Sequence, residues 1–157
     1  CEDVPNPAKY HWEPLFDYAL YPVCSPDFLA KIDTPVTIDA LMAQPLVAIY
    51  TEVQNWETWV TSAGGTFQPA APFLMVDTLA VALEMALNGE GIALVNGPFV
   101  EQDLASGRLV QPISHKALCP GAWGLICRKD MRENLRIRTF MDWVVRNVAD
   151  ARKSGEV

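Results

Sequence analysis

The stretch VDTLAVALEMALNGEGIALV, residues 76–95, decides the fold predicted for this chain. Either Asp77 or Thr78 can cap a helix, and the apolar segment that follows is long enough to form one. Asn88-Gly89 favours the end of that helix, and residues 92–95 form a short apolar run suited to a strand. Because the helix is apolar nearly all round, it is predicted to be buried.

The same alternation of strand and helix patterns extends outward from this stretch and predicts the order β-α-β-α-β-α-β of a parallel α/β sheet. Asn55 is predicted to cap one helix, and Pro98 to open another at its favoured first position. Two flanking strands are predicted to act as connectors, and a last helix carries an apolar stripe. The predicted strands lie at residues 15–24, 46–50, 73–76, 92–95, 109–113 and 122–128, and the stripe at residues 137–148.

Composition and charge narrow the class of protein. Half of the 157 residues are apolar, which is enough for one complete lobe and part of a second. Residues 1–127 carry four basic and fourteen acidic side chains, so this part repels nucleic acid, whereas residues 128–157 carry eight basic and five acidic ones. The basic tail fits the solvated face of a helix better than a phosphate-binding stripe. The apolar stretch 79–95 is interrupted by polar residues and is too short for a membrane span.

Cysteine and histidine usage argues against metal and disulfide chemistry. The four cysteines form no C-x-x-C pair and only two histidines accompany them, so a zinc site is not expected. A reduced compartment fits, with Cys24 and Cys127 as small core residues. His11 and His115 are predicted to be exposed loop residues. No G-x-S-x-G elbow, P-loop, H-E-x-x-H or dinucleotide fingerprint occurs, so neither an enzyme nor a cofactor is expected.

Five segments of the chain, taken together and in order, resemble the effector-binding domain of LysR-type transcriptional regulators, in particular the group of the glycine-cleavage activator and the β-lactamase regulator. The segments are PLFDYALYPVCSPDFLA at 14–30, NWETWVTSAGG at 55–65, VDTLAVALEMALNGEGIALV at 76–95, VEQDLASGRLVQP at 100–112 and FMDWVV at 140–145. The resemblance implies a periplasmic-binding-protein-like (type 2) fold, in which two α/β lobes joined by two hinge strands hold a small-molecule effector between them.

The resemblance also implies a division of the chain. Residues 1–23 would be an entry segment with the first hinge strand, residues 24–112 a complete α/β lobe, and residues 113–157 the return strand and last helix of an incomplete first lobe. The family's helix-turn-helix is missing, so the chain is expected to start in mid-protein and to meet DNA only through that absent part. It is expected to be cytoplasmic, to contact no membrane and to form a homo-oligomer through effector domains.

Six residues are candidates for contact with the effector. The carboxyl ends of parallel strands and the following helix N-termini favour an anionic or carbonyl ligand group, so a small polar, anionic effector is expected there. For Thr78 a purely structural capping role is the alternative, and for Trp123 a core position between the lobes. For Asp77 the capping role is favoured over contact with the effector. The candidates are Tyr50, Thr51, Asp77, Thr78, Leu79 and Trp123.

Two other functions remain as alternatives. A periplasmic solute-binding protein shares the fold, but four cysteines without evident pairing and the absence of a leader count against it. A small α/β enzyme would need a nucleophile and a base, and no such pair can be identified. The sensing domain of a regulator is therefore the predicted function.

Overall fold

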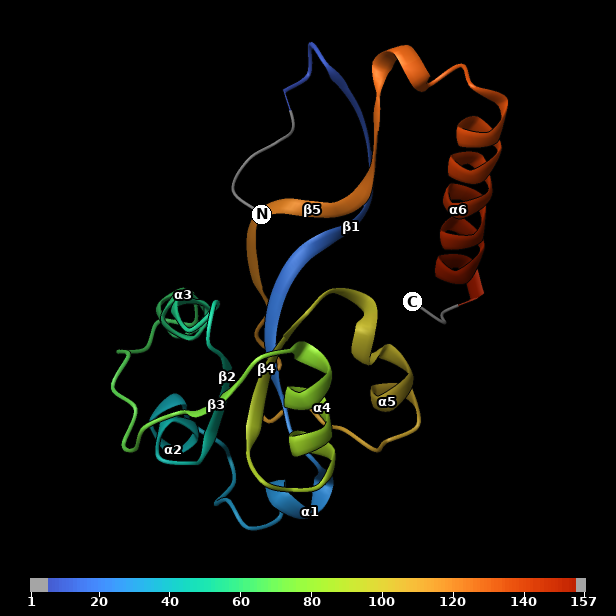
Figure 1. Ribbon diagram of the computed structural model, residues 1–157. Coiled ribbons are helices and arrows are strands. Elements are labelled where there is room, and N and C mark those ends of the chain that lie inside the picture. The colour runs from blue at the N-terminus through green and yellow to red at the C-terminus, as the bar shows by residue number, and fades with distance from the viewer. Residues whose placement is uncertain (1–5, 155–157) are drawn as a thin grey trace. The chain divides into compact units, whose positions relative to one another are not determined.

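The computed structural model describes residues 6–154, and the chain divides into two compact units (Figure 1). Unit 1 comprises the residues up to Tyr18 and from Leu118 onward, and unit 2 comprises Ala19–Ala117. The elements, in order, are β1 Tyr10–Val23, α1 Pro26–Leu29, α2 Ile38–Met42, β2 Leu46–Ile49, α3 Gln54–Ser62, β3 Leu74–Val76, α4 Leu79–Leu87, β4 Ile92–Asn96, the 3₁₀ turn η1 Gly97–Val100, α5 Glu101–Ala105, β5 Ala117–Arg128, the 3₁₀ turn η2 Lys129–Met131 and α6 Leu135–Ser154.

The sheet has the neighbour order β3-β2-β4-β1-β5 and mixes both strand directions. β2 pairs in parallel with β3 and with β4, as the alternating pattern predicts, whereas β1 pairs antiparallel to β4. The strand predicted at 109–113 does not form, and only Val110 bridges to Cys24 through two backbone hydrogen bonds of 3.0 and 2.8 Å. β1 ends there because Ser25 caps helix α1, which leaves the segment after Val110 without a strand to pair with.

The core of unit 2 lies on both faces of β4, all five residues of which are buried. Alternate residues of a strand point to opposite faces, and Ala93 and Val95 join the cluster that contains Ala82 and Ala86 of α4. The prediction that α4 is buried all round is wrong, because its Val81 is 43% exposed. Helix α4 packs on the sheet through small alanines, and its apolar outer residues remain accessible.

Helix α3 covers the core with two fully buried indoles, Trp56 and Trp59. Trp56 Nε1 donates a hydrogen bond of 2.9 Å to the carbonyl of Val47, which ties the helix to β2. The prediction that Asn55 caps this helix is wrong. The helix begins at Gln54, two residues before the start that an Asn55 cap implies, and the Asn55 amide donates to the Glu52 carboxylate at 3.0 Å.

The helix that Pro98 is predicted to open starts differently in the structure. Residues 97–100 form the 3₁₀ turn η1, and the α-helix α5 begins only at Glu101. Proline supplies no backbone N–H and is compatible with either kind of first turn, so the sequence alone does not distinguish them.

Unit 1 combines the first part of β1 with β5 and α6. Both strands begin earlier than predicted, at Tyr10 and Ala117, and α6 extends beyond both ends of the predicted stripe at residues 137–148. Within the described part of α6 the stripe buries Met141, whereas Phe140 and Trp143 are 57% and 56% exposed. Most of the apolar surface of this helix is therefore not covered by the described residues.

The segment Gly89-Glu90-Gly91 connects α4 to β4, and each of its two glycine positions requires that residue for a different structural reason. Gly89 has a φ of +71°, the left-handed conformation in which glycine ends helices at little cost. A Cβ at Gly91 would lie 2.7 Å from the carbonyl oxygen of Pro45, which accepts the hydrogen bond from the amide of Ile92. Gly91 therefore allows β4 to approach the start of β2.

We expect Gly91→Ala to lower the free energy of unfolding by about 1–3 kcal/mol, the usual cost of overpacking at a position where the backbone must move. Chemical denaturation followed by tryptophan fluorescence measures this change. Gly107→Asn is the control, because Gly107 has a φ of +73° with no atom within 4 Å of the place a Cβ would occupy, and asparagine tolerates that conformation. Equal losses for the two variants would contradict the close-approach explanation.

Candidate functional site

The carboxyl ends of β2 and β3 and the N-terminus of α4 meet at one edge of unit 2. The amide of Tyr50 donates to the carbonyl of Val76 at 3.0 Å, which joins the turns that follow the two strands. Thr78, with extended backbone, is the N-cap of α4, and its Oγ1 accepts a hydrogen bond of 3.3 Å from the amide of Val81. Of the two predicted caps, Thr78 is therefore the one used, and Asp77 is not.

An open hollow of about 420 Å³ lies at this edge and is lined by Tyr50, Met75, Val76, Asp77 and Val81. Three of these side chains are largely accessible, with Tyr50 63%, Met75 51% and Val81 43% exposed. Amides in the first turn of a helix lack intrahelical carbonyl partners, so the adjacent N-terminus of α4 favours a hydrogen-bond acceptor. The edge can thus contact both an apolar group and a polar one.

Three of the six predicted residues lie at or beside this hollow, and the other three do not line it. Tyr50 and Asp77 line the hollow, and Thr78 caps the helix beside it. Thr51 is exposed, with its carbonyl accepting from Gln54 Nε2 at 3.4 Å, while Leu79 packs against the core cluster. Trp123 belongs to β5 in unit 1 and is 41% exposed. Their contacts with an effector stay predictions.

Met75 and Val81 are not among the residues predicted from the sequence, although a signal for each was present. Val81 follows the cap Thr78 by three residues, which places the two on the same side of the first helical turn. Met75 lies in β3, which the topology makes an edge strand of the sheet, so a large apolar side chain there has less cover. The edge strand and the first helical turn, considered together, indicate both residues.

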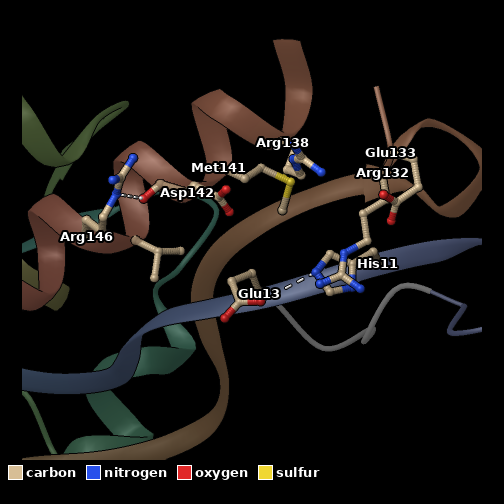
Figure 2. Close-up of a pocket in the computed structure, with 9 residues that line it drawn as sticks. His11, Glu13, Arg132, Glu133, Arg138, Met141, Asp142 and Arg146 are labelled. Atoms are coloured by element: carbon tan, nitrogen blue, oxygen red, sulfur yellow. Dashed lines mark hydrogen bonds and ion pairs between the residues drawn. The ribbon is translucent and has the colours of Figure 1, made fainter. Parts of the chain in front are cut away.

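A second hollow, of about 540 Å³, lies within unit 1 and is lined mainly by charged side chains (Figure 2). His11 and Glu13 extend from β1, and their Nε2 and Oε2 atoms are 3.4 Å apart. Arg146 Nε donates to the carbonyl of Asp142 at 3.0 Å. The other lining residues are Arg132, Glu133, Arg138, Met141 and Val145. Acidic and basic groups balance here, so this hollow selects no ligand charge.

The prediction of exposed loop histidines is wrong for His11 and holds in part for His115, which lies in the loop before β5 but is partly buried. His11 lies in strand β1 and is partly buried. His115 is held by Ser62, whose Oγ lies 2.8 Å from His115 Nε2, and its carbonyl accepts from Trp59 Nε1 at 3.0 Å. The carbonyl of Trp59, 2.8 Å from Ser62 Oγ, is a second acceptor for the hydroxyl proton besides the imidazole. The pair therefore has a structural role and lacks the arrangement of an activated nucleophile.

Neither a metal site nor a membrane span occurs in the described part of the chain. Within residues 6–154, no group of three or more His, Cys, Asp or Glu side chains is placed to hold a metal ion. No helix in the same part of the chain is both long and apolar enough to cross a bilayer.

The cysteines differ in accessibility. Cys24 is fully buried at the end of β1, and burial raises the pKa of its thiol to about 11. Cys119 and Cys127, both in β5, are partly accessible, so the prediction that Cys127 is a core residue holds only in part. Cys1, also noted in the sequence, lies outside the described residues.

We expect iodoacetamide to modify Cys119 and Cys127 in the native protein at neutral pH and to leave Cys24 unmodified. The thiolate is the reactive species, and Cys24 is both buried and protonated. Peptide mass spectrometry with and without denaturant measures the pattern, and denatured protein, in which Cys24 reacts, is the control. Native modification of Cys24 at the rate of Cys127 would show that β1 opens at this point.

Comparison with known proteins gives a consistent set of matches. The family model described as LysR substrate binding domain matches residues 1–149. The glycine cleavage system transcriptional activator of Escherichia coli K12 is 26% identical over 137 residues, covering 87% of this chain and 45% of its own length. The transcriptional activator AmpR of Yersinia enterocolitica is 29% identical over 143 residues, covering 89% and 47%. The chain spans about half the length of these curated relatives.

A solved structure gives the same picture for the fold. The effector domain of the transcriptional regulator AmpR of Pseudomonas aeruginosa superimposes with a TM-score of 0.75 at 24% sequence identity. The match covers 92% of this chain and 69% of that domain.

Proposed function

Because the chain belongs to the family of LysR substrate binding domains, we propose that it is the effector-sensing part of a bacterial LysR-type transcriptional regulator. Its fold is the periplasmic-binding-protein-like (type 2) fold of LysR effector-binding domains, as the sequence resemblance implies. The named relatives are transcriptional regulators and not enzymes, in agreement with the absence of a catalytic motif. They also favour this function over the alternative of a periplasmic solute-binding protein.

The observation that carries the proposal is the hollow beside the N-terminus of α4. Tyr50 and Asp77 line it, and Thr78 begins the helix whose first amides seek an acceptor. A small polar effector with an anionic group would bind there by hydrogen bonds to these amides. Thr51, Leu79 and Trp123 remain candidates for support of the bound effector.

The proposed mechanism is a clamp made of two lobes. An effector shifts the balance between open and closed states only by its difference in affinity for the two, so contacts made solely in the closed state carry the signal. In the proposed division, residues 24–112 form one complete lobe, with 1–23 and 113–157 supplying the hinge strands and the end of the other lobe. DNA would be contacted only by a helix-turn-helix elsewhere in the parent regulator, in the cytoplasm.

Thr78→Val in the parent regulator tests the location of the site. Valine keeps the shape but removes the hydroxyl, so we expect about five- to tenfold more effector to be needed for half-maximal transcription. Loss of the cap should also lower the free energy of unfolding by about 1 kcal/mol. A reporter-gene titration measures the first effect and thermal unfolding the second.

Thr78→Ser is the matched control, because serine keeps the hydroxyl and the cap. Basal DNA binding should be unchanged in both variants, since the cap lies in the sensing domain. A Thr78→Val regulator with the wild-type concentration dependence would remove Thr78 from the site and leave Tyr50, Thr51 and Trp123 as the candidates to test next.

The proposal includes association of the sensing domains through exposed apolar surface. Leu135, Phe140 and Trp143 of α6 are 68%, 57% and 56% exposed, which is unusual for large apolar side chains grouped on one helix. We expect light scattering to show concentration-dependent dimers of this chain, and Phe140→Ser with Trp143→Ser to weaken them by about tenfold or more. Tyr50→Ser, which removes an exposed aromatic ring from unit 2, is the control. A single monomeric species at high concentration would contradict association.

A further inference from the structure

The hollow beside α4 is apolar and acidic. Of its five lining side chains, Asp77 is the charged one, and the walls are formed by the Tyr50 ring, Met75, Val76 and Val81. No lysine, arginine or histidine of the described residues lines it. Unit 2 as a whole carries three basic and ten acidic side chains. A ligand with negative charge alone would therefore meet an unfavourable electrostatic environment at this edge.

The Asp77 carboxylate has no structural role among the described residues. Thr78, and not Asp77, caps helix α4, and Asp77 is exposed at the rim of the hollow. Among the described residues no hydrogen bond or ion pair engages its carboxylate. A carboxylate in such a position is suited to accept charge-assisted hydrogen bonds from a cationic group.

The apolar walls require a second ligand feature. Tyr50, Met75 and Val81 expose 63%, 51% and 43% of their surface around Asp77, which is a contiguous apolar surface with one acidic group. An apolar ligand group that covers these side chains removes their apolar area from water, which favours binding. A fully polar ligand would not obtain this favourable free energy.

Taking the location of the site from the proposed function, we infer that the effector carries an ammonium group held by Asp77 and an apolar group seated against Tyr50, Met75 and Val81. Combined with the acidic group expected at the start of α4, this describes a zwitterion of the apolar amino-acid type. The inference replaces a simple anion by a molecule with both charges.

Matched sets of small probes test the ligand class on this chain. Each set contains an apolar L-amino acid (valine, leucine or methionine), the carboxylic acid that lacks its amino group and the amine that lacks its carboxyl group. Amide chemical-shift titrations by NMR report both the binding site and the affinity. We expect at least one amino acid to shift the amides of residues 76–82. The acid that lacks its amino group should bind there with an affinity at least about tenfold lower.

Two variants with the same change of charge separate the local effect of Asp77 from the overall charge. Asp77→Asn should weaken binding of the amino acid about tenfold, and it should leave binding of the deaminated acid unchanged or improved. Glu84→Gln, which neutralises an exposed carboxylate farther along α4, should change neither.

The outcomes distinguish the inference from the proposed function. If the deaminated acid shifts residues 76–82 as strongly as the amino acid and Asp77→Asn changes neither, the ammonium group is excluded while the site remains. If binding is seen only at other residues, or no probe shifts residues 76–82, both the ligand class and the location are wrong. If the amine alone binds as tightly as the amino acid, the effector is a cation and the zwitterion is excluded.

Discussion

Strand β4 has both faces buried, and the rest of unit 2 is arranged around this constraint. Each of its backbone polar groups needs a partner away from water, and β2 and β1 supply these from either side. One face then requires small residues on the helix that covers it, which Ala82 and Ala86 provide. Because only Asp77 and Thr78 connect β3 to α4, the N-terminus of this helix lies at the carboxyl end of β3. Burial of one strand thus positions the candidate site.

The elements around β4 could be predicted from the sequence because both signals are local. Apolar runs indicate buried segments, and the residues that begin or end helices lie next to them. β2, β3, α4 and β4 all lie where the pattern predicts them. Periodicity carries no information on strand direction, and so the antiparallel pairing of β1 with β4 comes only from the structure. The predicted strand at 109–113 fails for a tertiary reason, since Leu109 is buried and Val110 bridges to Cys24, but no described strand lies beside the rest of the segment.

The candidate site was predictable at its polar residues and less so at its apolar walls. Tyr50, Asp77 and Thr78 follow from the rule that ligands bind at the carboxyl ends of parallel strands. Choosing Thr78 over Asp77 as the cap needed the backbone geometry, because both residue types cap helices well. Asn55 failed as a cap because α3 begins at Gln54 and therefore already contains Asn55, which residue type alone does not indicate. Met75 and Val81 depend on edge position and helix face, which are properties of the assembled sheet.

The cap at Thr78 has a consequence for how such a sensor can diversify. The Thr78 hydroxyl caps the first turn of α4 beside the hollow, so in the proposed site a substitution there would change both stability and effector binding. Tyr50, Met75 and Val81 project from the same edge with large exposed surfaces, and their replacement disturbs little of the core. In the proposed site, single mutations at these three positions would change effector preference at little cost in stability, whereas mutations at Thr78 would also destabilise α4. The proposed site thus combines one residue that stability constrains with three residues that are free to vary.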